Sequence, residues 1–201
     1  MKRALIGGIG NVLLGDDGIG PYVVRLLDSM YAFDERVDEN ADENVEIADL
    51  GTPALDLTHQ IVGLHALILV DSVASDGVGD DPAGTILLFR KEDILRETPT
   101  QRLDPHSPAL SECLMTAAML GDSPEHVLLV GIVGKCYEPG DPLTAAVRES
   151  VGDAIDAILQ ELHRLGFAFR KKTTCDEPGI WWSDRKAQLF PEQRNVMESR
   201  D

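Results

Sequence analysis

The chain has 201 residues, of which 35 are acidic and 18 are basic, so its formal net charge at pH 7 is −17. A surface of that sign repels phosphate groups, which argues against a nucleic acid or an anionic membrane as a partner. With 43% hydrophobic and 26% charged residues the composition is that of a globular protein, and the length suits a single domain.

The first residues resemble a secretory signal only in outline. Lys2 and Arg3 precede an apolar stretch, but that stretch contains several glycines and runs into Asp16 and Asp17 without a small-residue cleavage site. No later apolar run approaches the roughly 20 residues that span a bilayer. The three cysteines are odd in number and widely spaced, which favours a reducing compartment over a disulfide framework. We therefore expect a cytoplasmic protein with no membrane insertion.

Strands alternate with helices in the first part of the chain. Short apolar runs predict buried strands at residues 4–6, 45–48 and 66–70. After the first strand, apolar side chains at helical spacing predict a helix that starts at Pro21, because proline suits the first helical turn. Residues 7–20 then form the connecting loop. A short helix is expected over residues 55–62.

The alternation continues in the second part. β-rich and apolar runs predict strands at residues 85–89 and 127–133. Ser107–Pro108 and Asp141–Pro142 each place a capping side chain before a proline, which predicts two helix starts. Helices between nearly continuous apolar strands predict an α/β fold with a mostly parallel five-stranded sheet and helices on both faces, which is a three-layer α/β/α sandwich.

The apolar periodicity stops after Gly166. We therefore expect one domain over residues 1–166 and a C-terminal extension of unknown role over residues 167–201. The extension is nearly balanced in charge, so the acidic excess belongs to the domain. The pair Trp181–Trp182 in the extension could dock on the domain itself or anchor a partner.

Three aspartates, Asp17, Asp49 and Asp71, lie where predicted strands end. In a parallel sheet these ends share one edge, where ligands bind, so the carboxylates can converge. His106 directly precedes the helix start at Ser107, where the positive end of a helix keeps an imidazole neutral and able to bind a metal. Two carboxylates and one imidazole leave coordination positions open for a ligand. The alternative is that Asp17 and Asp71 cap helices and that His106 is an ordinary surface histidine.

Other catalytic patterns are absent or incomplete. Gly8 and Gly10 resemble the start of a dinucleotide fingerprint, but Leu13 takes the third glycine position and the pair Asp16–Asp17 would repel a pyrophosphate. The sequence contains no serine-hydrolase elbow, no HExxH and no CxxC. Metal assistance is therefore favoured over covalent catalysis.

Four separated blocks of the sequence resemble the hydrogenase maturation endopeptidase family. They are Gly8–Gly20 (GIGNVLLGDDGIG), Asp49–Thr52, Leu69–Ser72 and Asp104–Ser107, and each falls at a predicted strand end or helix start. The resemblance implies a twisted five-stranded α/β sandwich. It also implies an endopeptidase that removes a C-terminal peptide from the large-subunit precursor of a nickel-iron hydrogenase after nickel has been inserted.

Matched residue by residue, the family's metal-contacting trio falls on Asp17, Asp71 and His106, the same residues that their positions in the predicted fold single out. We take them as the catalytic and metal-contacting set. Peptide hydrolysis needs a polarised carbonyl and an activated water, and a divalent metal supplies both. The resemblance implies that this metal is the nickel already seated in the precursor, with an intrinsic ion such as zinc as the alternative.

The turn Asp49, Gly51 and Thr52 matches a block that is associated in the family with substrate recognition. We group Asp16 with this turn, although its place beside a ligand position favours a part in shaping its loop. The sequence departs from the family at Pro53–Ala54, where a glycine is common.

Two functions from other classes remain open at this point. The chain could be a nickel-binding chaperone that has kept the trio without cleaving a substrate. It could also be a small-molecule hydrolase or binding module that uses the same crevice.

Overall fold

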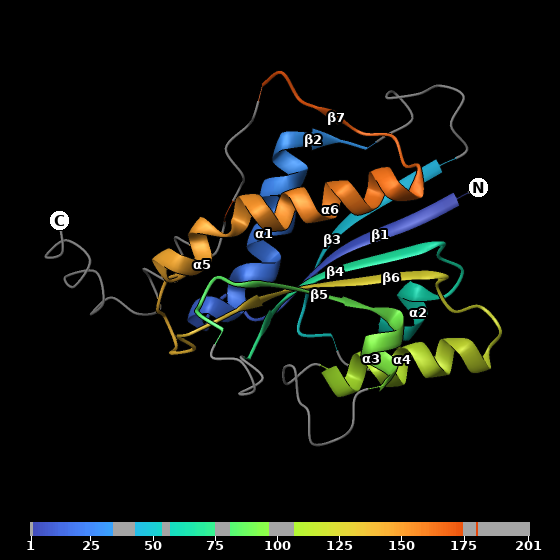
Figure 1. The fold of residues 1–201 in the computed structure, drawn as a ribbon, viewed down its shortest axis with the longest axis horizontal. Helices are drawn as coiled ribbons and strands as arrows, with labels where there is room; N and C mark the ends of the chain where they lie inside the picture. Colours follow the sequence, from blue (N-terminus) through green and yellow to red (C-terminus); the bar gives the residue numbers. More distant parts are fainter. Residues whose placement is uncertain are drawn as a thin grey trace, which may run out of the picture.

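A five-stranded sheet forms the centre of the molecule in the computed structural model, which describes residues 2–33, 43–53, 57–74, 81–96, 107–174 and 180 (Figure 1). The strand order is β3-β1-β4-β6-β5, in which β5 is antiparallel to β6 and the other neighbours are parallel. The strands are β1 (Lys2–Ile9), β3 (Glu43–Gly51), β4 (Ala66–Val73), β5 (Ile86–Arg90) and β6 (His126–Val133). The predicted mostly parallel five-stranded sheet is confirmed.

Helices cover both faces of this sheet (Figure 1). One face carries α1 (Ile19–Met30), α5 (Ala145–Glu149) and α6 (Val151–Leu165), and the other carries α2 (Leu57–Ile61), α3 (Lys91–Arg96) and α4 (Ser107–Met119). The central strand β4 is buried along its whole length, and its alternate side chains enter the two cores. A strand packed on both faces has no polar side to display, which explains its continuous apolar run. No helix of the described residues is long and apolar enough to cross a membrane.

The first turn of helix α1 packs against two parallel strands, β1 and β4. It follows a short 3-10 turn, η1 (Gly15–Gly18), and starts at Ile19, two residues before the predicted start at Pro21. A Cβ atom on Gly20 would overlap the carbonyl oxygens of Ile9 in β1 and Val70 in β4. The first turn of α1 can therefore approach the sheet only because this position has no side chain.

The helix start predicted at Asp141–Pro142 is wrong. Helix α5 starts at Ala145, its N-cap residue Thr144 is extended, and Ser150 separates α5 from α6. The extended backbone at Thr144 points its N–H at the carboxylate of Asp16, at 2.7 Å. A tertiary contact therefore delays the helix beyond the local capping signal.

The chain after Gly166 continues to contact the domain. Phe167 is buried in the core that also contains α1 and α6. Strand β7 (Arg170–Lys171) pairs antiparallel with β2 (Tyr31–Ala32), and the rings of Phe169 and Tyr31 lie 6.2 Å apart. The first residues of the predicted extension thus pack on the α/β domain, whereas Trp181–Trp182 lies outside the described residues.

An ion pair between the partly exposed Arg90 and the buried carboxylate of Glu161 connects β5 to α6 on the side opposite to β3. Glu161 on α6 accepts hydrogen bonds from Arg164 at 2.7 and 2.9 Å and from Arg90 at 2.6 Å. The hydrogen bonds from Arg164 and then from Arg90 lower the pKa of Glu161 to about 2, against the opposing effect of burial. The charged form of Glu161 is therefore the form that stabilises the fold.

We expect Gly20→Ala to lower the free energy of unfolding by roughly 1–3 kcal/mol or more, because the added methyl group overlaps two backbone carbonyl groups that cannot move aside. The matched control is Gly152→Ala in α6, where an added Cβ meets nothing within 4 Å. That control should be neutral or stabilising by up to about 1 kcal/mol, since alanine is the better helix former. Urea unfolding of both variants tests this, and equal stabilities would contradict it.

We expect Glu161→Gln to lower the free energy of unfolding at pH 7 by roughly 2–3 kcal/mol. The folded-state pKa lies below the ordinary value of 4.5, so the stabilisation is present above pH 4.5 and is lost as the pH falls towards 2. The difference in the free energy of unfolding between wild type and variant should therefore become smaller below pH 4.5. Urea unfolding at several pH values measures it. Asp156→Asn, at an exposed position on the same helix, is the control; a difference for Glu161→Gln that is independent of pH would disprove the assignment.

Candidate functional site

A glycine-rich loop carries Asp16 and Asp17 to the carboxyl edge of the sheet, between β1 and α1. Gly10 has a φ of 131°, and a Cβ there would overlap the carbonyl oxygen of Asp17. The loop therefore folds back on itself at a position that only glycine fits. This fold lets the backbone N–H of Asn11 donate to Oδ2 of Asp17 at 2.8 Å, which orients that carboxylate.

Asp71 reaches the same edge from the central strand. It lies in β4 one residue after Val70, which is in register with Gly8 of β1. Its side chain is buried, and Oδ1 accepts a hydrogen bond from the backbone N–H of Ser72 at 2.8 Å. The strand thus holds this carboxylate in one place.

Tyr137 approaches the residue next to Asp71. Its hydroxyl lies 3.0 Å from Oγ of Ser72, the residue after Asp71. Burial raises the pKa of Tyr137, the hydrogen bond with Ser72 opposes this, and the charges of Asp16, Asp17 and Asp71 raise it further. All three carboxylates therefore lie within electrostatic reach of one phenol group, which stays protonated at neutral pH.

Asp16 joins its loop to the segment of residues 134–144. Its carboxylate is fully buried and accepts hydrogen bonds from the backbone N–H groups of Lys135 at 2.9 Å, Cys136 at 3.0 Å and Thr144 at 2.7 Å. The Thr144 hydroxyl donates a fourth at 3.1 Å, and the N–H of Asp16 donates to the Cys136 carbonyl at 2.8 Å. These contacts give Asp16 a part in shaping the loop, and its enclosed oxygens offer no surface to a substrate.

The turn at the end of β3 lies next to this loop. The N–H of Gly10 donates to the carbonyl of Gly51 at 2.7 Å, and Gly51 has a φ of 60°. Oδ1 of Asp49 accepts a hydrogen bond from the N–H of Gly51 at 3.1 Å, which closes the turn. The side chains of Asp49 and Thr52 are exposed. The turn expected to recognise a substrate is therefore adjacent to the loop that carries Asp17.

Two members of the predicted trio, Asp17 and Asp71, lie at the carboxyl ends of neighbouring parallel strands, and the charges of both raise the pKa of Tyr137. The third, His106, lies outside the described residues together with Asp104 and Pro105. Helix α4 starts immediately afterwards, at Ser107, on the side of the molecule where the parallel strands end (Figure 1).

Sequence reasoning missed Tyr137, Ser72 and Thr144. A usable signal existed for Tyr137, because β6 ends at Val133 and residues 134–137 follow a parallel strand end in the same way as Asp17 follows β1. Gly134 supports this position, since a Cβ there would overlap the Tyr137 hydroxyl. No local pattern predicts Thr144, whose contact with Asp16 spans 128 residues.

Comparison with known proteins agrees with this architecture. The sequence profile of the family described as hydrogenase maturation protease matches residues 21–161. Hydrogenase 2 maturation protease of Escherichia coli K12 is 29% identical over 164 residues, which cover 82% of this chain and 93% of that protein. The hydrogenase expression/formation protein HupD of Bradyrhizobium diazoefficiens is 30% identical over 173 residues, or 86% of this chain and 84% of that protein.

A solved structure shows the same fold. The hydrogenase maturating endopeptidase HybD from E. coli matches with a TM-score of 0.72 and 26% sequence identity, over 85% of this chain and 98% of that chain. The twisted α/β sandwich expected from the sequence is therefore confirmed.

We expect Asp16→Asn to lower the free energy of unfolding by about 1–3 kcal/mol, because the new amide places a donor against N–H groups that need an acceptor. Hydrogen exchange should also show faster exchange of the Lys135, Cys136 and Thr144 amides. Asp156→Asn is the control for loss of one negative charge at an exposed site. Unchanged stability and unchanged exchange would show that the buried carboxylate does not hold the two loops together.

Proposed function

The chain belongs to the hydrogenase maturation protease family, and we propose on this basis that it is the endopeptidase that removes the C-terminal peptide of a nickel-iron hydrogenase large-subunit precursor after nickel insertion. The observation that carries the proposal is the match of residues 21–161 to the family, and it is supported by Asp17 and Asp71, whose charges both act on Tyr137. The partner is then the precursor subunit. The proposed compartment is the cytoplasm, because the widely spaced cysteines suggest a reducing environment.

We take the nickel ion of the precursor as part of the substrate, with Asp17, Asp71 and His106 as the residues that contact it. Two carboxylates from separate strand ends suit a divalent cation, which offsets the repulsion between them. His106 would add an imidazole from the residue before α4, and imidazole suits nickel and zinc. A divalent metal at such a site polarises a carbonyl group and lowers the pKa of a bound water. An intrinsic zinc ion on the same residues is the competing version.

The protein's own contribution is to hold its ligands before the substrate arrives. The N–H of Asn11 orients Asp17, and the N–H of Ser72 orients Asp71. The Tyr137 hydroxyl hydrogen-bonds Ser72 and remains protonated beside the acidic groups. Groups held in this way need little rearrangement on binding, which is how an enzyme lowers the entropic cost of aligning a scissile bond.

The exposed turn at Asp49, Gly51 and Thr52 is the proposed contact for the polypeptide of the precursor. It lies beside the loop of Asp17 through the Gly10–Gly51 hydrogen bond, so a chain bound there would pass close to the carboxylates. Because Asp16 is enclosed, its share in recognition is indirect and acts through the shape of the loop.

The decisive measurement is cleavage of a purified large-subunit precursor in nickel-loaded and nickel-free form, followed by mass spectrometry. We expect loss of a C-terminal peptide from the nickel-loaded precursor only. Asp71→Asn and Asp17→Asn should each reduce the rate by at least on the order of 100-fold, because each removes a charge that contacts the metal.

Two controls separate the alternatives. Asp153→Asn, an exposed acidic residue on α6, should cleave as fast as wild type, and circular dichroism should show that all variants are folded. Binding of nickel-loaded precursor without any mass change would favour a chaperone. Equal cleavage of both precursor forms would rule out recognition through nickel, and a metal-free enzyme that regains activity only with zinc would favour an intrinsic ion.

A further inference from the structure

A second group of side chains that can bind a metal lies at the amino-terminal ends of the parallel strands, whereas the aspartates lie at the carboxyl ends. His65 directly precedes β4, Glu125 directly precedes β6, and His126 is the first residue of β6. Asp71 lies six residues along the strand direction from His65, which is roughly 20 Å at the rise of a β-strand. The group is therefore separate from the site proposed for the hydrogenase precursor.

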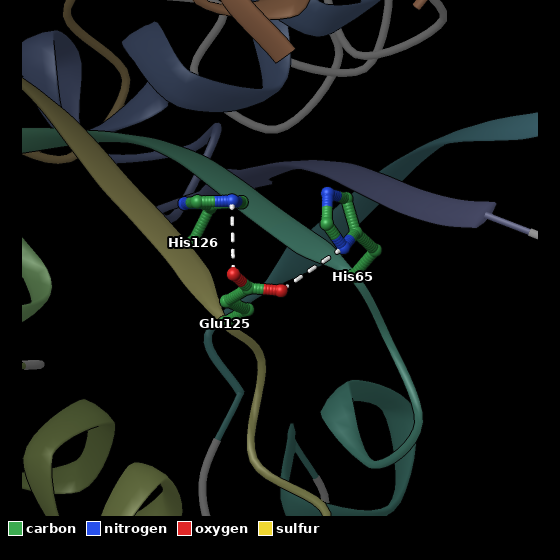
Figure 2. Close-up of side chains that lie close together, drawn as sticks. All are labelled: His65, Glu125 and His126. Atoms are coloured by element: carbon green, nitrogen blue, oxygen red, sulfur yellow. Dashed lines mark ion pairs between the residues drawn. The ribbon is translucent and has the colours of Figure 1, made fainter. Parts of the chain in front are cut away.

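The three side chains point toward one another (Figure 2). Oε2 of Glu125 lies 3.5 Å from Nδ1 of His65, and Oε1 lies 3.7 Å from Nε2 of His126. One ligand atom from each residue lies within 4.8 Å of the other two. Atoms that share a tetrahedral metal at about 2.1 Å are roughly 3.4 Å apart, so an ion fits here with small side-chain rotations.

Backbone hydrogen bonds join the two residues that carry the imidazoles. The N–H of His126 donates to the carbonyl of His65 at 3.1 Å, and the N–H of His65 donates to the carbonyl of Arg3 at 2.8 Å. The rings meet edge to face with their centroids 4.9 Å apart. Neighbouring parallel strands thus hold the backbones of His65 and His126 side by side, and the exposed side chain of Glu125 is free of packing that would restrict its rotation.

Basic side chains near the group are held by other partners. Beside His65, Lys2 Nζ hydrogen-bonds the Leu165 carbonyl at 2.5 Å and lies 4.0 Å from Glu43. A cavity of about 350 Å³ borders Glu125 and His126, and its lining also includes Arg90, Lys91 and Arg164. Arg90 and Arg164 are paired with Glu161, and Lys91 donates to the Pro124 carbonyl, so these basic groups already have partners. The cavity leaves space beside His126 for a fourth ligand.

We infer that His65, Glu125 and His126 form a binding site for a divalent transition-metal ion such as zinc, at the amino-terminal edge of the sheet. Two imidazoles and one carboxylate are donors that suit zinc, and three protein ligands leave one coordination position for water. An ion there would join the starts of β4 and β6, which is a structural role distinct from peptide cleavage.

Equilibrium dialysis of the full chain against Zn²⁺ tests the site, with His65→Gln, His126→Gln and Glu125→Gln compared with wild type. Each histidine variant should weaken binding at this site by more than the roughly 10- to 100-fold that changes outside the ligand set cost. His163→Gln removes an exposed imidazole on α6 and should bind as wild type does. Zn²⁺ should also raise the thermal midpoint of wild type and of His163→Gln, but not that of the ligand variants.

Equilibrium dialysis of the double variant Asp17→Asn/Asp71→Asn distinguishes Zn²⁺ bound at the histidine group from Zn²⁺ bound at the aspartates. This variant should keep the Zn²⁺ that the histidine variants lose. Glu125 is exposed, so Glu125→Gln is expected to fold even if a histidine variant does not. The inference is overturned if Glu125→Gln and the folded histidine variants bind Zn²⁺ as tightly as His163→Gln, or if Asp17→Asn/Asp71→Asn alone abolishes binding.

Discussion

The candidate site depends on the hydrogen bonds that the buried carboxylate of Asp16 accepts. A carboxylate without solvent is stable only when its oxygens are hydrogen-bonded, and four donors from residues 135–144 meet this requirement. Asp17 follows Asp16 in the chain, and Tyr137 follows Cys136, one of the donors. One set of hydrogen bonds therefore positions two elements that are more than one hundred residues apart, and the same contacts delay the start of α5.

Strand β4 connects this site to the rest of the molecule. It is buried on both faces, supplies Asp71 at one edge of the sheet and follows His65 at the other. Both ends of the parallel strands carry acidic or histidine side chains, yet most of the 35 acidic residues lie elsewhere. The acids with structural or chemical roles are those held by neighbours, such as Asp16 by backbone N–H groups and Glu161 by two guanidinium groups.

Most of the fold could be predicted from the sequence, because buried apolar residues recur in it with the period of a helix or a strand. All five strands of the main sheet were predicted, as were α1, α2 and α4, since apolar side chains there recur at the spacing of their element. The prediction failed at Asp141–Pro142, where a local capping signal competes with Thr144 and its tertiary partner Asp16. It also missed the short pairing of β2 with β7, because two-residue strands have no periodicity.

Motifs and apolar patterns are local, so the residues alone were enough to identify the family, the fold class and the position of two aspartates at strand ends. Which groups surround those aspartates follows from the folded chain. It enclosed Asp16, placed the Tyr137 hydroxyl 3.0 Å from Ser72, and brought His65 to the Glu125–His126 pair from a separate strand. A strand end can be predicted from local residues, as before Tyr137, but these partners depend on strand order and loop path, which arise from the packing of the whole core.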